Sequence, residues 1–121
     1  MIRKRTAVRL GAVVVAATAG LGLSAATASA STTYTANVPG CAGGMVVTFA
    51  DGHDHVQGYA TSTTGDGCSV VLTQSNGGRS SNWTSIPHDT AWTAKLLDAG
   101  ITSYVVVCNL DSRRCATSAS Y

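Results

Sequence analysis

The sequence predicts an all-β fold: a small antiparallel β-sandwich of six to seven short strands, stapled by disulfide bonds. Three observations lead to this prediction. After residue 30 the chain is rich in Ser, Thr and Gly, with no Glu and one Lys, a composition poor in helix formers. Short apolar stretches with alternating polar residues recur between turn signals. Four cysteines follow residue 30, in a domain too small to rely on its apolar core alone.

The expected strands cover residues 34–38, 45–50, 56–62, 68–74, 83–86 and 101–108. Turn-forming residues follow several of them, such as Pro39-Gly40, Asp51-Gly52 and Pro87. The fourth stretch shows the clearest alternation of apolar and polar residues. The last is the most apolar, so we expect it at the centre of a sheet.

Residues 89–99 fit two interpretations. In a strand, alternate side chains would turn toward the core: Trp92, Ala94 and Leu96. In a short helix, Asp89 would be the N-cap, and the fold would become α+β with this one helix. The alternation runs unbroken through the segment and favours the strand, because isolated short helices are only marginally stable.

The first 30 residues have the three parts of a secretory signal peptide. Basic residues at positions 3, 4, 5 and 9 precede an apolar stretch, residues 10–23, and the segment ends in Ala28-Ser29-Ala30. Cleavage after Ala30 would leave residues 31–121 as a single secreted, extracellular domain. An uncleaved anchor is the alternative, but Gly, Ser and Thr make this segment less apolar than a typical spanning helix.

The charge of residues 31–121 excludes two classes of partner. Four scattered basic residues and six acidic residues give a net charge of −2 with His neutral. Nucleic-acid binding requires a clustered basic surface, which so few cations do not supply. Polybasic attachment to a membrane surface, after removal of the signal peptide, is excluded for the same reason.

Cys41, Cys68, Cys108 and Cys115 are expected to form two disulfide bonds, because export places them in an oxidising compartment. No C-x-x-C pair is present, which argues against a zinc site, and paired cysteines are unavailable for thiol catalysis. Four cysteines allow three pairings. We favour Cys41–Cys68 with Cys108–Cys115, since each bond joins sequence neighbours and the second closes a short hairpin-like loop.

His53 and His55 are the candidate metal ligands. Two histidines two residues apart in an extended segment project the same way and could share one ion. Asp51, Asp54 or the distant His88-Asp89 would have to supply a third ligand. A polar turn between two strands explains the same residues, so we expect no metal and no other cofactor.

No catalytic centre is expected. The chain lacks the G-x-S-x-G sequence of serine hydrolases. A domain of this size also leaves little concavity in which two opposed carboxyl groups could enclose a sugar.

Two pairs of residues are candidates for binding. Arg113 and Arg114 lie in the loop that the second disulfide would close, and a rigid loop loses little entropy on binding. An arginine held in this way could enter the acidic pocket of a trypsin-like protease, although a basic surface turn is the simpler interpretation. Trp83 and Trp92 are either exposed platforms for sugars or partner proteins, or core residues. The small size of the domain favours the core.

Small exported inhibitors of proteases and of α-amylase from actinobacteria resemble this chain in general plan: a signal peptide, two disulfides and antiparallel strands. The α-amylase inhibitors resemble this chain in one pattern: a first cysteine, here Cys41, is followed by a second, Cys68, directly after a turn that contains Gly67. Alternating residues then follow the second cysteine, here with Val70 and Leu72 as the apolar positions. Their Trp-Arg-Tyr triplet is absent here, as is the Cys-Pro of the subtilisin inhibitors. The resemblance therefore concerns architecture and implies no particular target.

The leading functional hypothesis is a small secreted binding or inhibitor-like module that acts by surface recognition, without catalysis. Its expected partner is an extracellular protein, such as a hydrolase, or a component of the cell envelope. Two alternatives stay open. One is a structural or interaction protein of the cell envelope or extracellular matrix, and the other is an exported metal-binding protein that uses the two histidines.

Overall fold

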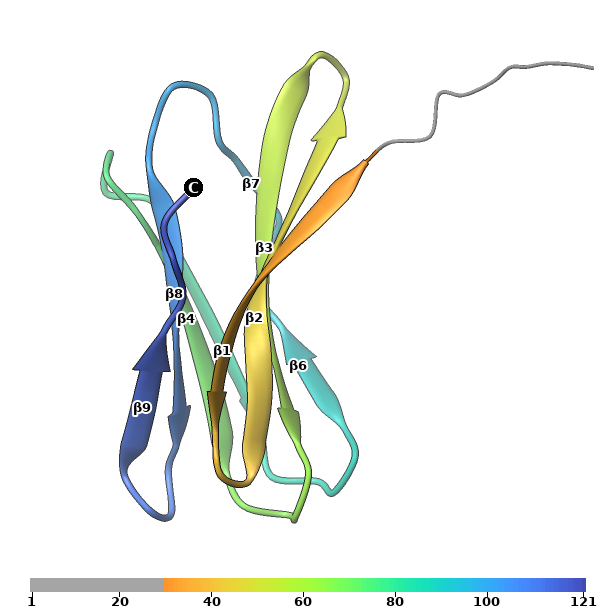
Figure 1. The fold of residues 1–121 in the computed structure, drawn as a ribbon, viewed down its shortest axis with the longest axis vertical. Coiled ribbons are helices and arrows are strands. Elements are labelled where there is room, and N and C mark those ends of the chain that lie inside the picture. Colours follow the sequence, from red (N-terminus) through yellow and green to blue (C-terminus); the bar gives the residue numbers. More distant parts are fainter. Residues whose placement is uncertain (1–29) are drawn as a thin grey trace, which may run out of the picture. The chain divides into compact units, whose positions relative to one another are not determined.

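Two antiparallel sheets packed face to face make up residues 30–121, the part of the chain that the computed structural model describes (Figure 1). Sheet 1 has the strand order β1-β2-β3-β6, and β7 also pairs with β3. Sheet 2 has the order β5-β4-β8-β9. The bounds are β1 Ser31–Val38, β2 Cys41–Ala50, β3 His53–Ser62, β4 Cys68–Gln74, β5 Arg79–Thr84, β6 Thr90–Trp92, β7 Leu96–Leu97, β8 Ser103–Asn109 and β9 Arg114–Thr117. The predicted all-β sandwich is confirmed.

The core lies between the sheets, and the alternation of the strands sends every second side chain into it. The largest fully buried apolar side chains are Met45 and Val56 from sheet 1 and Val70, Leu72, Val105 and Val107 from sheet 2. Glycines on the inner face of sheet 1 let these valines approach closely. A Cβ on Gly43 would lie 2.6 Å from Cγ2 of Val107, and one on Gly58 would lie 2.9 Å from methyl carbons of Val70 and Val105.

The two disulfide bonds have different places in the fold. Cys41–Cys68 joins β2 to β4, so it connects the two sheets, and both residues are buried. Cys108–Cys115 joins directly opposed residues of β8 and β9 within sheet 2, where Cys115 is exposed. The pairing favoured from the cysteine spacing is confirmed.

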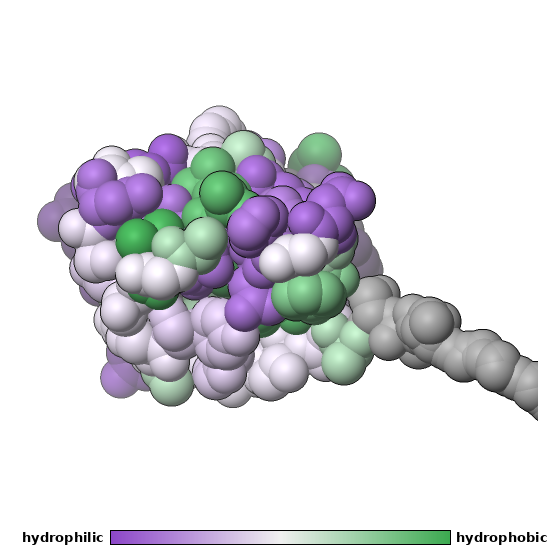
Figure 2. Space-filling model, turned by 90° about the horizontal axis from the view of Figure 1, so that it is seen from above, coloured by the Kyte–Doolittle hydropathy of each residue, from purple (hydrophilic) through white to green (hydrophobic). Residues whose placement is uncertain are grey.

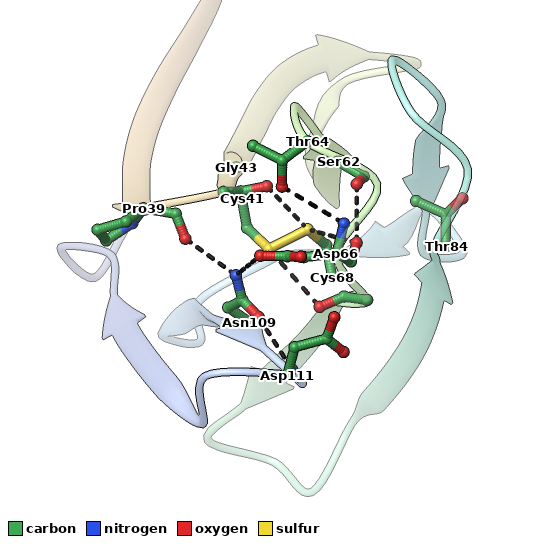
Figure 3. The surroundings of a disulfide bond; sticks show 12 residues. Pro39, Cys41, Gly43, Ser62, Thr64, Asp66, Cys68, Thr84, Asn109 and Asp111 are labelled. Atoms are coloured by element: carbon green, nitrogen blue, oxygen red, sulfur yellow. Dashed lines mark hydrogen bonds between the residues drawn. A yellow bond between two sulfur atoms is a disulfide. The ribbon is translucent and has the colours of Figure 1, made fainter.

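A polar network closes the sandwich next to the Cys41–Cys68 bond (Figure 3). The buried Asn109 donates from Nδ2 to the Pro39 carbonyl at 3.0 Å and to Oδ2 of Asp66 at 2.9 Å. Its Oδ1 accepts the backbone N–H groups of Asp111 and Ser112. One side chain of sheet 2 thereby fixes the β1–β2 turn, the β3–β4 loop and the β8–β9 hairpin.

Nine strands form within residues 30–121, where six to seven were expected, and several bounds differ. The strand at residues 68–74 agrees with β4, whereas β1, β2 and β3 begin three to four residues before their predicted starts. The turn after β4 is tighter than expected, because the Gln74 N–H binds the Gly78 carbonyl and the Gly77 N–H binds the Gln74 carbonyl. As a result β5 starts at Arg79 and ends before Ile86. The short β9 was not anticipated as a strand.

Residues 89–99 form β6 and β7 with a break between them, so the helix of the α+β alternative is wrong. The predicted inward direction of Trp92 and Ala94 is also wrong. Both are exposed, while Ala91 and Thr93 are buried. Thr93 takes the inner position because its N–H donates to the Gly58 carbonyl, and its Oγ1 accepts the Gly58 N–H at 2.9 Å. Leu96 does pack against the core, as expected.

The residues after β9 continue along the same edge of β8, where the Ser118 N–H donates to the Val105 carbonyl. Ser103 and Tyr121 exchange backbone hydrogen bonds in both directions. The Tyr121 hydroxyl donates to Oδ2 of Asp54 at 2.6 Å, and its ring lies 5.9 Å from that of Tyr34. This hydrogen bond to a carboxylate raises the pKa of Tyr121 above the ordinary 10.0, because it favours the protonated hydroxyl.

The predicted signal peptide, residues 1–30, lies outside the described residues except for Ala30. Residues 31–121 form one compact unit, in which no helix is long and apolar enough to cross a membrane.

Candidate functional site: an aromatic sheet face

The outward surface of sheet 1, here called the aromatic face, is the candidate site. Cross-strand partners share a face of a sheet, so the pairings identify its residues. They are Ser31, Thr33, Thr35 and Asn37 from β1; Ala42, Gly44, Val46, Thr48 and Ala50 from β2; His53, His55, Gln57, Tyr59 and Thr61 from β3; Thr90 and Trp92 from β6; and Leu97 from β7. None of them is Asp, Glu, Lys or Arg. Two histidines, His53 and His55, are the only ionisable side chains of this face besides the Tyr59 phenol.

Two aromatic rings lie side by side at the β6 end of one row across this face. Tyr59 of β3 and Trp92 of β6 are direct cross-strand partners. Their ring centroids are 5.3 Å apart and their planes are inclined by 39°. Contacts of this geometry favour aromatic pairs, so the two rings stabilise each other's position. Trp92 nevertheless keeps 47% of its surface exposed.

The same row continues from the aromatic pair to Gly44 and Thr35. Gly44 has no side chain to stand up beside the rings, and the Tyr59 hydroxyl lies over it, 3.2 Å from where a Cβ would be. A Cβ there would also lie 2.6 Å from the Tyr34 carbonyl oxygen. Glycine at this position therefore allows Tyr59 to lie flat along the sheet, which makes the row low and broad.

Hydrogen bonds hold the backbone beneath the rings in place. The Trp92 carbonyl accepts the side-chain amide of Asn82 at 2.9 Å, which ties β6 to the edge of sheet 2. The next carbonyl, of Thr93, accepts Nε2 of Gln57 at 2.9 Å. Both aromatic residues have few rotatable bonds, so their platform loses little conformational entropy when a ligand binds.

Trp83 lies elsewhere, on the outward surface of sheet 2, opposite Ser69 of β4. It is 62% exposed. The expectation that both tryptophans belong to the core is therefore wrong. The core positions near them are filled by smaller residues, Thr84 next to Trp83 and Ala91 next to Trp92. Close packing between the sheets leaves no room for an indole there.

The two candidate metal ligands, His53 and His55, both lie on the outward side of β3, as two residues of one strand must. Within residues 30–121 no group of three or more His, Cys, Asp or Glu side chains is placed to hold an ion. The His88 N–H binds the carbonyl of Ser62, at the far end of β3. That residue and its neighbour Asp89 are thus not brought to the two histidines.

Arg113 and Arg114 lie at the tip of the β8–β9 hairpin, and both are exposed. Arg113 has a φ of 63°, and its N–H donates to the Asn109 carbonyl, so it closes a tight turn. Arg114 is already paired with Asn109 in the sheet ladder. A segment that enters a protease cleft as an added strand needs an extended backbone with free polar groups. This hairpin tip does not have that form.

The end of the sandwich at the top of Figure 1 shows hydrophobic side chains scattered among hydrophilic ones (Figure 2). Phe49, in the last part of β2, and Tyr121 are exposed. Single exposed apolar residues of this kind are normal on protein surfaces. No pocket is present in residues 30–121.

Comparisons of the chain with protein-family models, with curated proteins and with solved structures find no match. The sequence analysis identified Trp92 as a candidate but missed Tyr59 and Gly44. The sequence did contain a signal for Tyr59. It lies at an odd-numbered position of the stretch 56–62, whereas the core residues Val56 and Ala60 lie at even-numbered positions, so its ring must point outward. No sequence feature could have placed Gly44 beneath it.

Proposed function

We propose that this chain is a small secreted binding module that recognises its ligand through the aromatic face, without catalysis. The observation that carries the proposal is the Tyr59–Trp92 pair. It is a fixed, partly exposed aromatic surface on a sheet face whose strand residues carry no Asp, Glu, Lys or Arg. Leaving a large indole in water costs burial energy of about 1.5–3 kcal/mol. A fold that keeps it exposed and aligned with a second ring is consistent with use in binding.

Surface recognition is the mode that fits this site. A flat row without an enclosing cavity suits a ligand that is itself extended, because each unit of such a ligand makes a small contact and the contacts add. The secreted location rests on the leader sequence together with the two disulfide bonds, which form in oxidising compartments.

The inhibitor form of the hypothesis, with Arg113 or Arg114 as the inserted residue, has weaker support. Its favourable feature is the Cys108–Cys115 bond, which restrains the hairpin. Its unfavourable feature is the left-handed backbone of Arg113. A panel of trypsin-like proteases, assayed with the wild type and the two arginine-to-alanine variants, would establish this activity if only the wild type inhibited one of them.

The proposed function is tested by capture from culture medium with the oxidised protein as bait. The wild type, Trp92→Ala and Trp83→Ala are compared under one set of conditions. We expect the wild type and Trp83→Ala to retain the same material and Trp92→Ala to lose it, since only Trp92 belongs to the aromatic face. Equal retention by all three baits would show that this face is not the binding surface.

A further inference from the structure

The aromatic face has a chemical character that narrows the class of ligand. We infer that it binds a neutral polysaccharide chain, lying across the strands along the row Thr35–Gly44–Tyr59–Trp92. This inference rests on the proposed function and adds the identity of the ligand class to it. Three properties of the face support this inference: its rings, its polar groups and its lack of charge.

The rings match one side of a sugar. A pyranose ring presents C–H groups on its face and hydroxyl groups around its rim, so it buries its apolar side against an aromatic ring. Trp92 is exposed enough to receive one such unit, and Tyr59 lies beside it with its hydroxyl over Gly44. With strands about 4.8 Å apart, the row from Thr35 to Trp92 spans roughly 14 Å, the reach of a short oligosaccharide.

The polar groups that border the rings are neutral. Thr35 supplies a hydroxyl group at the β1 end of the row, and Thr33, two residues earlier on β1, supplies another beside the row. Gln57 uses Nε2 to bind the Thr93 carbonyl, which leaves its Oε1 as an acceptor. On the other side, the hydroxyls of Thr61 and Thr90 are 2.6 Å apart and share one hydrogen bond. Sugar hydroxyls need partners of this kind, which both donate and accept.

The lack of charge disfavours the other extended ligands. A nucleic acid requires Lys or Arg along its phosphates, and the strands of this face have neither. Acidic or basic polymers would likewise find no opposite charge among these residues. A protein partner favours an apolar patch at the centre of the contact. Here the positions next to the two rings carry hydroxyl or amide groups or are glycine, and the apolar Ala42 and Val46 lie only diagonally from Tyr59.

The test measures depletion of the purified, oxidised protein from solution by insoluble polysaccharides. The neutral panel contains cellulose, chitin, xylan, mannan and a β-1,3-glucan; carboxymethyl cellulose and heparin resin are the charged controls. We expect binding to at least one neutral polymer, with less than a twofold change in affinity between 50 mM and 500 mM salt, since no charge is involved.

Two variants alter the row in opposite ways. Trp92→Ala removes a ring, whereas Thr35→Arg adds a long side chain at an exposed position on the edge strand, where it would lie across Gly44. Each should weaken binding to the neutral polymer at least tenfold. Trp83→Ala, the matched control on sheet 2, should change it less than twofold. Unchanged midpoints of urea unfolding would show that all three variants are folded.

The outcomes separate the ligand class from the proposed function. Depletion by no neutral polymer, or neutral binding that both row variants leave unchanged, would overturn the polysaccharide inference. So would binding only to the charged polymers that is lost in salt. If Trp92-dependent capture from medium persisted in any of these cases, the proposed function would stand with a ligand of another class. If that capture also failed, both would fall.

Discussion

Removing the two disulfide bonds one at a time should destabilise this protein unequally. The variants are the double substitutions Cys41→Ala/Cys68→Ala and Cys108→Ala/Cys115→Ala. The first bond spans 27 residues of sequence and the second spans 7. In the loop-closure relation these lengths correspond to about 3.6 and about 2.4 kcal/mol of stabilisation at 25 °C.

The surroundings of the bonds increase this difference. Cys41 and Cys68 are buried between the sheets, so their replacement also removes two packed sulfur atoms from the core. A cavity of that size adds on the order of 1 kcal/mol. Cys115 is exposed, and its replacement leaves little or no void. We therefore expect the loss for the inter-sheet bond to exceed the loss for the hairpin bond by about 2 kcal/mol.

Equilibrium unfolding in urea, followed by tryptophan fluorescence and by far-UV circular dichroism, measures both losses. A domain of this length has a total stability of about 5–14 kcal/mol, so either loss is measurable, and the first could leave the protein partly unfolded at 25 °C. In that event the midpoint is measured at lower temperature for all variants. Equal losses, or a larger loss for the hairpin bond, would refute the reasoning from loop length and burial.

Three further predictions follow from particular contacts. Asn109→Ala should lower the free energy of unfolding by about 1–3 kcal/mol, because it leaves the Pro39 carbonyl and the Asp66 carboxylate without their shared donor. Urea unfolding measures this loss. A loss below about 0.5 kcal/mol, the effect of an ordinary surface substitution, would contradict the prediction. Gly58→Ala should cost about 1–3 kcal/mol, since its Cβ would lie 2.9 Å from core methyl groups, and an unchanged or raised melting temperature would disprove the close packing. Tyr121→Phe should lower the melting temperature below pH 10, and the size of this effect should shrink above pH 10. The pKa of Tyr121 is higher in the folded protein than in the unfolded chain, where it is 10.0. The hydroxyl's contribution to stability is therefore complete below pH 10 and is lost as the pH rises through the pKa of the folded state. A difference between wild type and Tyr121→Phe that is the same at pH 8 and pH 11 would rule out that hydrogen bond as its source.

The fold class was predictable because its signals are local. Alternation over residues 68–74 and turn residues between short apolar stretches each act within a few positions of the chain. The pairing of the cysteines was predictable for a related reason. Bonds between sequence neighbours suit this fold, because four of its strand pairs, β1–β2, β2–β3, β4–β5 and β8–β9, join consecutive strands, and neighbours in sequence tend to be neighbours in space.

The site was only partly predictable, because it depends on partners far apart in sequence. Tyr59 and Trp92 meet through the register of β3 against β6, and no pattern within either segment specifies that register. The predicted inward direction of the Trp92 side chain is wrong for a second reason. That prediction places the most apolar residues inward, whereas in the structure Thr93 takes the inner position because it makes two hydrogen bonds with Gly58. A polar residue can occupy a core position when its hydrogen bonds are satisfied there.

The exposed tryptophans and the inter-sheet disulfide are connected through the size of the core. Both indoles lie outside, so the space between the sheets is filled mainly by Val, Ala and Gly, which bury less apolar area per residue. Such a core gives a small domain a low free energy of unfolding. The Cys41–Cys68 bond increases this stability by linking the two sheets covalently. The aromatic face depends on that stability, because Tyr59 and Trp92 come from strands that only the folded sheet brings together. The Cys41→Ala/Cys68→Ala variant should therefore bind less at a face that contains no cysteine, in proportion to the fraction of its molecules that unfold. The Cys108→Ala/Cys115→Ala variant, which loses only the hairpin bond of sheet 2, should bind like the wild type at temperatures where it remains folded.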